Sequence, residues 1–448
     1  MLVNHSVSQN PIEITTLEGK GLSVLVLCEL YIAQKNVHFL LEVAHFFVRF
    51  CYLCKKHFIM KNLQGYFDTL LEETTSSFHR YMFNRIDWDN RLIGLVGPRG
   101  VGKTTLMLQH AKEELPRHRT LFVTAEDMYF ASNNLVELAT DFAKKGGRYL
   151  IIDEIHKMEE WSRYLKLVYD YQPKLNVIFT GSSILDITKG AHDLSRRAIT
   201  YHMQGLSFRE YLSLFHEIHL DTYSLESIIR HEVNMPEGFR PLELFKDYLQ
   251  RGYYPFAMEN QYEMRLKQVI NNTLEVDIPQ YAKMNVATGR KLKQLLGVVS
   301  RSVPFKPNMT TLATVLDTSR NSIPDFFIYL EGAGLIAQLR DNTGGVRGLG
   351  KVDKVYLDNT ALVYNLAGDE ADIGNVRETF FNNQMRINQE VLASRVSDFE
   401  IGEYTFEVGG KNKKQKQIED VDNGYIVKDD IERGYLNVIP LWMFGLNY

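Results

Sequence analysis

Short, nearly uninterrupted apolar runs alternate with amphipathic stretches between residues 92 and 203 of this 448-residue chain. Continuous apolar runs of this length are typical of buried strands in a parallel sheet, because helices cover both faces of such a sheet. The predicted fold class is therefore α/β, with a parallel sheet flanked by helices. We expect strands at 92–96, 120–124, 149–153, 176–180 and 199–203.

On either side of this core the apolar positions recur at helical spacing. Residues 65–80 carry apolar side chains on one face, which predicts a helix in front of the first strand. Residues 206–285 show the same spacing and predict a helical subdomain, interrupted by a turn at Gly252 to Pro255.

Residues 286–356 predict a third unit, in which three helices precede two strands at 334–339 and 354–357 joined by Gly344-Gly345. This order is typical of a winged helix-turn-helix. Either this unit contacts DNA phosphates or it is a packing module. Its recognition helix would begin at Arg320 and Asn321, and the cations expected on its wing are Arg340, Arg347, Lys351 and Lys354.

The first predicted strand runs directly into a glycine-rich segment that fits the phosphate-binding loop pattern G-x-x-x-x-G-K-[ST] at every fixed position. Glycines let backbone N–H groups converge on phosphate oxygens, and the following helix adds partial positive charge. Lys103 can reach the β- and γ-phosphates of ATP, and the Thr104 hydroxyl can bind Mg²⁺. The expected nucleotide-binding residues are Gly97, Pro98, Arg99, Gly100, Val101, Gly102, Lys103, Thr104 and Thr105.

Two adjacent carboxylates, Asp153 and Glu154, follow the third predicted strand. The carboxyl end of a parallel strand faces the crevice where ligands bind. We therefore expect Asp153 to hold Mg²⁺ and Glu154 to orient an attacking water.

Small hydroxyl residues end the fourth predicted strand, and two arginines follow it. Thr180, Ser182 or Ser183 could sense the γ-phosphate, and we assign Ser182 to the catalytic set with Lys103 and Glu154. Phosphoryl transfer often uses an arginine supplied in cis or by a neighbouring subunit. Arg197 is preferred for this role.

Residues 81–212 resemble prokaryotic AAA-type ATPases that carry a C-terminal domain of unknown function. The resemblance implies nucleotide and metal binding by Lys103 and Thr104, metal binding by Asp153, catalysis by Glu154 and an arginine finger at Arg197. The sequence departs from the family at Arg196, where a small residue is expected, so the choice between the two arginines stays open. The matching segments are Asn84 to Trp88, Gly97 to Thr105, Asp153 to Lys157 with Trp161-Ser162, Phe179 to Ser183, Asp193 to Arg197 and Leu206 to Tyr211.

Residues 357–448 resemble the C-terminal domain of the same family, which is similar to restriction endonucleases. A two-metal nuclease needs carboxylates and a lysine that converge. Here Glu378, Asp398, Glu407 and Lys411 could supply them, but the expected Glu-x-Lys triplet is stretched to Glu407 to Lys411. We therefore interpret this unit as a degenerate nuclease-like domain.

Composition narrows the choice of partners and compartment. The net charge is −4, so nucleic-acid binding would need a local basic patch. Only three cysteines occur, which fits a reducing cytoplasm. Residues 1–59 contain all three and are interpreted as an over-extended start, with Met60 as the natural first residue; a packed helical extension or a membrane anchor are the alternatives.

These patterns and the resemblance together predict five regions: the extension 1–59, an ATPase core 60–205, a helical region 206–285, the winged helix 286–356 and the nuclease-like unit 357–448. The helical region resembles the lid that closes over the nucleotide in AAA-type ATPases, and a plain helical subdomain without a gating role is the alternative. We expect ATP and Mg²⁺ as ligands and hydrolysis that moves the C-terminal units, with DNA, a protein or a second copy of the chain as partner. A slow nucleotide-gated switch and an ATP-regulated nuclease are the alternative functions.

Overall fold

A computed structural model describes residues 37–182, 194, 196–282, 284, 286–301, 304–342, 351–413 and 418–448. The chain divides into two units, Met1–Asn62 and Leu63–Tyr448. Helix α2 spans Val37–Glu73 and contains the boundary between them. Among the helices of the described residues, none is long and apolar enough to cross a membrane.

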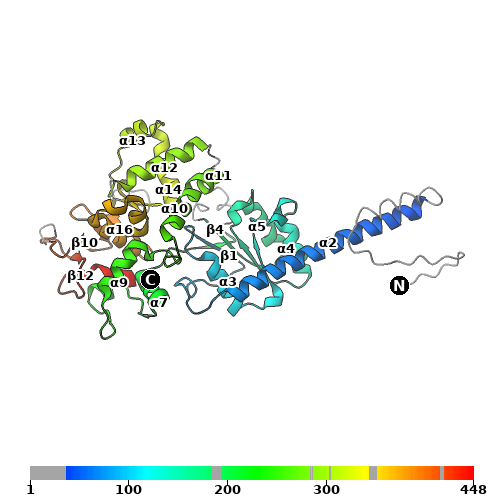
Figure 1. Ribbon diagram of the computed structural model, residues 1–448, viewed down its shortest axis with the longest axis horizontal. Helices are drawn as coiled ribbons and strands as arrows, with labels where there is room; N and C mark the ends of the chain where they lie inside the picture. The colour runs from blue at the N-terminus through cyan, green and yellow to red at the C-terminus, as the bar shows by residue number, and fades with distance from the viewer. Residues whose placement is uncertain are drawn as a thin grey trace. The chain divides into compact units, whose positions relative to one another are not determined.

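A five-stranded parallel sheet forms the core of the second unit, in the strand order β2-β3-β4-β1-β5. Most of its side chains are buried, as the apolar runs predict, although β5 is largely exposed. The parallel α/β core is therefore confirmed (Figure 1). The strands are β1 (Leu92–Gly97), β2 (Thr120–Thr124), β3 (Tyr149–Asp153), β4 (Asn176–Ser182) and β5 (Ile199–His202).

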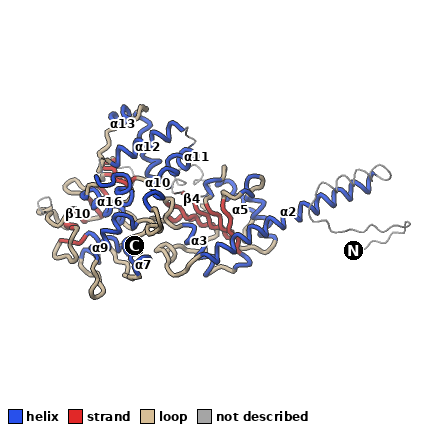
Figure 2. The backbone as a smooth tube through the Cα atoms, in the orientation of Figure 1, coloured by secondary structure: helices blue, strands red, loops and turns tan. Residues whose placement is uncertain are grey.

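Three longer helices belong to this core: α3 (Lys103–Glu113), α4 (Leu135–Lys144) and α5 (Trp161–Tyr171). Helix α3 follows β1 after the glycine-rich loop and packs against β1 and β4, while α4 packs against α5. Figure 2 shows the strands of this sheet as a group of red segments with α3 and α5 beside them.

The helix predicted at 65–80 ends at Glu73, so its second half is wrong. The next residues run without regular structure because Arg80 is drawn into a buried network with Glu210. Burying a guanidinium requires that its donors find partners, and a continued helix would not place this side chain there.

The regular structure of residues 206–282 is a series of short helices, as predicted. Helix α7 begins with a capping box, in which the Ser207 hydroxyl accepts from the Glu210 N–H and the Glu210 carboxylate accepts from the Ser207 N–H. The elements are α7 (Phe208–His216), α8 (Leu225–Ile229), α9 (Pro241–Asp247), the π-helix η5 (Tyr248–Gly252), α10 (Tyr262–Asn272), the π-helix η6 (Thr273–Asp277) and α11 (Ile278–Ala282).

The next region has the predicted order of helices followed by an antiparallel strand pair, in which Ile336 is aligned with Leu357. The turn at Gly344-Gly345 and Arg347 lie outside the described residues. The elements are α12 (Val286–Ser300), α13 (Met309–Val315), the 3-10 helix η7 (Arg320–Ser322), α14 (Ile323–Gly332), β6 (Ile336–Arg340) and β7 (Val352–Leu357).

The last region contains two helices, α15 (Thr360–Ala367) and α16 (Ile373–Met385), and a five-stranded mixed sheet. Buried aromatic residues Phe208, Phe245 and Phe380 connect this region to the α7–η5 helices, so one apolar core continues across both. The strands are β8 (Leu392–Ala393), β9 (Phe399–Ile401), β10 (Tyr404–Gly409), β11 (Gly424–Lys428) and β12 (Val438–Pro440), followed by the 3-10 helix η10 (Leu441–Leu446).

Candidate nucleotide-binding site

The backbone of the phosphate loop requires glycine at three positions. Gly100 and Gly102 have φ angles of 83° and 96°, in the left-handed region that side chains disfavour. A Cβ atom at Gly97 would lie 2.1 Å from the backbone oxygen of Met203, so two backbones meet directly there. The glycines of the sequence pattern are thus explained by backbone geometry alone.

Lys103 begins helix α3, and its side chain folds back on its own loop. The ammonium Nζ donates to the backbone oxygens of Gly97 and Pro98, both at 2.9 Å. Burial lowers the pKa of Lys103, against the opposing charges of Glu154 and Asp153. An anion placed in this loop would offset the cost of that burial.

Asp153 stands at the carboxyl end of β3, between two threonine hydroxyls. Thr104 Oγ1 donates to Asp153 Oδ2 at 2.9 Å, and Thr180 Oγ1 donates to Asp153 Oδ1. Burial raises the pKa of Asp153, and the hydrogen bond from Thr180 acts against this. A hydroxyl beside a carboxylate is an oxygen donor pair of the kind that Mg²⁺ prefers.

Glu154 has a φ of 53°, an uncommon conformation for a residue other than glycine. Its N–H donates to Thr180 Oγ1 at 2.9 Å, and its Oε2 lies 3.2 Å from His156 Nδ1. Burial lowers the pKa of His156 to about 4, so this imidazole is neutral at pH 7. Because the Thr180 hydroxyl contacts both the Glu154 N–H and the Asp153 carboxylate, it links the two acidic residues.

Ser182 lies at the end of β4 and is aligned with Gly97 of β1. This places it beside the loop, but the hydroxyl that contacts Asp153 belongs to Thr180. In the sequence, Thr180 and Ser182 are equivalent candidates because both are small hydroxyl residues. Only the register of the sheet shows which of the two hydroxyls lies next to Asp153. Ser183 lies outside the described residues.

The two candidate arginines differ in their surroundings. Arg197 donates from Nε and Nη2 to the Asp170 carboxylate of α5, at 3.1 and 3.2 Å. Arg196 is exposed. The neighbouring positions Asp193 and Ser195 of the matching segment lie outside the described residues.

The remaining loop residues are held by other parts of the second unit. Arg99 Nη1 lies 3.1 Å from Asp277 Oδ2 of η6, and Pro98 is buried. The backbone oxygen of Val101 accepts from Arg80, while Thr105 is exposed.

Arg80 is a residue that the sequence analysis missed. Its Nε donates to Glu210 Oε1 at 3.0 Å and its Nη2 donates to the Gly205 oxygen at 2.8 Å, so it joins the loop to the start of α7. The available signal was the capping-box pattern S-x-x-E beginning at Ser207, although it does not reveal the arginine partner.

Arg85, within the matching segment Asn84 to Trp88, contacts the last region of the chain. Its Nη1 donates to Asn388 Oδ1 at 2.9 Å, and its guanidinium lies over the Tyr81 ring at 4.9 Å.

The cations expected on the wing are partly engaged by acids. Arg340 Nη2 lies 3.7 Å from Glu331, and Lys354 turns toward the last region of the chain. Arg320, Asn321 and Lys351 are exposed.

Three carboxylates of the last region, Glu378, Asp398 and Glu407, each lie beside a lysine ammonium. Lys354 Nζ lies 3.6 Å from Glu378 Oε2 and 3.6 Å from Asp398 Oδ1. Lys413 Nζ lies 2.5 Å from Glu407 Oε1. Within the described residues, no group of three or more histidine, cysteine or acidic side chains is arranged to hold a metal ion.

The lysine beside Glu407 is therefore Lys413, whereas Lys411 was expected. Lys411 is exposed in the turn after β10, and Lys414 and Lys416 lie outside the described residues. The extra residues after Glu407 form that turn, so a later lysine returns to the carboxylate.

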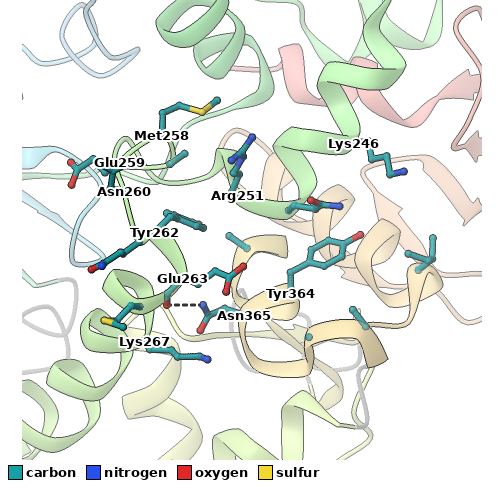
Figure 3. A pocket seen from close by; sticks show the side chains of 18 residues that line it. Lys246, Arg251, Met258, Glu259, Asn260, Tyr262, Glu263, Lys267, Tyr364 and Asn365 are labelled. Carbon is teal, nitrogen blue, oxygen red and sulfur yellow. Dashed lines mark hydrogen bonds between the residues drawn. The ribbon is translucent and has the colours of Figure 1, made fainter.

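A hollow of about 1230 Å³ lies between the η5–α10 segment and α15. Its lining mixes the cations Lys246, Arg251 and Lys267 with Tyr364 and Asn365 (Figure 3). Asn365 Nδ2 donates to a backbone oxygen in α10, which ties the two walls together.

Comparison with known proteins agrees with the loop geometry. Residues 89–212 match the family described as AAA domain, and residues 242–372 match a family described as a domain of unknown function, DUF8612. The second match extends across the predicted boundary between lid and winged helix. With the parallel sheet and the phosphate loop, the first match defines residues 89–212 as an AAA-type P-loop domain.

An uncharacterized protein of Methanocaldococcus jannaschii is 26% identical over 269 residues, which span 55% of this chain and 56% of that protein. Among solved structures, the ADP complex of S. cerevisiae Hsp104 is 15% identical over 59% of this chain and 39% of its own, with a TM-score of 0.29. AMPPCP-bound DnaA from Aquifex aeolicus is 13% identical over 59% of this chain and 85% of its own, with a TM-score of 0.24. We draw nothing further from similarities this low.

Proposed function

We propose that this protein binds ATP with Mg²⁺ at the phosphate loop and hydrolyses it. The observation that carries the proposal is the chain of contacts from Thr104 through Asp153 and Thr180 to Glu154. Thr104 and Asp153 would hold Mg²⁺, which neutralises phosphate charge when bound. Glu154, at the end of this chain of contacts, would orient the attacking water.

Lys103 would bind the β- and γ-phosphates after turning from the carbonyls of Gly97 and Pro98. This exchange replaces two neutral acceptors by a charged one, which makes a stronger hydrogen bond to an ammonium. Ser182 would lie near the terminal phosphate because it is aligned with Gly97.

An arginine from a second copy of the chain would complete the site, since AAA proteins commonly assemble into oligomers. Arg197 would have to leave Asp170 to act in this way, whereas Arg196 is exposed. Asp170→Ala would free Arg197, so turnover would stay intact if Arg197 is the finger. If the pair is structural, the same variant would lower the free energy of unfolding.

A slow nucleotide-gated switch is the second candidate function. It is favoured by the folded-back Lys103, because the contacts of its ammonium with Gly97 and Pro98 must break before it binds a phosphate, which suits occupancy-dependent signalling better than rapid turnover. In both cases the C-terminal region would respond to nucleotide and contact DNA or a protein partner.

Steady-state ATP hydrolysis by the full chain, with and without duplex DNA, tests the proposal. We expect Lys103→Ala and Glu154→Gln to lower turnover by roughly 100-fold or more, as the loss of a charge-stabilising group does. The matched controls are Lys144→Ala and Glu159→Gln, which alter exposed residues of the same domain.

Turnover that disappears in both variants but persists in both controls supports an ATPase. Faster turnover in the presence of duplex DNA would in addition support DNA as the partner. Tight ATP binding with negligible turnover in the wild type would favour the switch. Absence of ATP binding would overturn the proposal.

A further inference from the structure

The π-helix η6 places one buried carboxylate against two cations of the nucleotide site. Asp277 is 6% exposed. Its Oδ2 lies 3.1 Å from Arg99 Nη1, and its Oδ1 accepts from Lys157 Nζ at 2.8 Å. One carboxylate therefore compensates two positive charges.

The two cations belong to two different segments of the candidate nucleotide site. Arg99 belongs to the phosphate loop itself, and Lys157 follows β3 three residues after Glu154. Arginine and lysine bind phosphate oxygens as readily as carboxylates. Asp277 thus occupies cations that a nucleotide phosphate would also bind.

The electrostatic environment is consistent with this position. Burial raises the pKa of Asp277, but Lys157 and Arg99 outweigh it and lower the pKa overall. The charge of Asp277 also acts on Lys103, whose pKa it raises against the effect of burial. Asp277 therefore lies within electrostatic range of the phosphate-binding lysine.

Contacts beside this carboxylate close the loop from the same C-terminal region. A Cβ atom at Gly334 would lie 2.5 Å from Pro98 Cγ, and one at Gly100 would lie 2.9 Å from the Phe256 ring. Phe256 precedes η6 in the sequence and Gly334 follows it, so segments on both sides of η6 pack on the phosphate loop. A conformational change in the loop would therefore alter the packing of these segments.

We propose that Asp277 is an intramolecular anion that occupies Arg99 and Lys157 in the absence of nucleotide, and that the phosphates of ATP displace it. Displacement releases η6 from the loop and transmits nucleotide occupancy to the C-terminal region. This inference rests on the proposed ATP site and adds its regulation. It predicts that the observed ATP affinity is lower than the intrinsic affinity of the site, because the Asp277 contacts must break when ATP binds.

Isothermal titration of the full chain with ATP and with AMP, both with Mg²⁺, tests the inference. Asp277→Asn keeps the shape of the side chain and removes its charge. We expect roughly tenfold tighter ATP binding, because the competing state is depopulated, and little change for AMP, which lacks the β- and γ-phosphates. Glu275→Gln is the matched control, since Glu275 lies in the same π-helix and pairs with Lys293 at the surface.

Equal ATP affinity in the wild type and Asp277→Asn would overturn the inference and leave the ATP site standing. Weaker binding by Asp277→Asn would overturn it too, because the carboxylate would then support the nucleotide. If neither protein binds ATP, the proposed function fails and takes the inference with it.

Hydrogen exchange on the wild-type full chain gives an answer that does not depend on the variant folding. We expect backbone amides of residues 273–282 to exchange faster with Mg-ATP than without nucleotide, because η6 loses its anchor. Unchanged or slower exchange in this segment would contradict displacement.

Discussion

Single side chains decide how the two acids of the candidate site are held. Asp153 accepts hydrogen bonds from two threonines, one in the phosphate loop and one in β4. Thr180 is completely buried, and its hydroxyl also accepts from the Glu154 N–H. A buried hydroxyl with these partners is part of a network in which each bond fixes the next.

Thr180→Val should lower ATP turnover by about 10- to 100-fold while changing KM little, since valine has a similar shape but leaves Asp153 and Glu154 without their shared partner. Thr180→Ser should restore most of the activity. The control is Thr200→Val on the exposed strand β5. Steady-state kinetics would contradict this role if the valine variant retained wild-type turnover.

His110 makes a separate prediction about stability and pH. Its ring stacks on Trp88 with centroids 3.8 Å apart, and burial lowers its pKa to about 4. Because the unfolded pKa is higher, the unfolded state binds the proton first as pH falls from 6.5 to about 4. Stability contributed by the neutral ring is therefore lost across this window, by about 3 kcal/mol.

We expect His110→Phe to keep the stacking and to flatten the loss of unfolding free energy between pH 6.5 and 4. Urea unfolding at several pH values measures it, with His118→Phe, at an exposed position, as the control. An unchanged slope in His110→Phe would contradict the assignment.

At the scale of elements, the ion pair between Arg80 and Glu210 joins three parts of the domain. It links the segment after α2, the phosphate loop at Val101 and the start of α7. Both side chains are buried, so removing one charge leaves the other without a partner.

Glu210→Gln should therefore lower the unfolding free energy by about 3–5 kcal/mol. Glu160→Gln removes the partner of Arg163 in an exposed pair and should cost at most about 1 kcal/mol. Urea unfolding followed by circular dichroism compares the two variants. Similar small effects in both would show that the buried pair is not required for stability.

Helix ends were the least predictable elements. The apolar spacing predicted a helix through residue 80, and its amphipathic pattern does continue to Phe78. The helix nevertheless ends at Glu73, because the backbone before Arg80 must deliver that side chain to Glu210. That demand comes from a residue 130 positions later and leaves no mark on local periodicity.

At the scale of the whole molecule, each of three acids in the last region is paired with a lysine. Glu378 and Asp398 share Lys354 from the strand pair β6–β7, and Glu407 pairs with Lys413. Burial raises the pKa values of Glu378 and Asp398, although the charge of Lys354 acts in the opposite direction, and a raised pKa weakens a carboxylate as a metal ligand.

We therefore expect no Mg²⁺-dependent cleavage of plasmid DNA by the full chain, with or without ATP. Gel analysis of supercoiled DNA measures this directly. Cleavage that disappeared in Glu407→Ala but persisted in the exposed control Glu403→Ala would contradict it and restore the nuclease as a function.

The sequence by itself determined the phosphate loop, the strands of the parallel sheet and the positions of Asp153 and Glu154. These features are contiguous, and each is encoded by residue types at short, fixed spacing. Local glycine geometry and buried apolar runs leave few alternatives, so a single sequence is enough.

Only the tertiary structure decided which side chains meet across long separations. It selected Thr180 for Asp153, Glu210 for Arg80 and Asp277 for the loop residue Arg99. The last two partners are 178 positions apart in the chain. Such contacts depend on how helices pack on the sheet, and a charged residue carries no local signal of the partner that packing will bring to it.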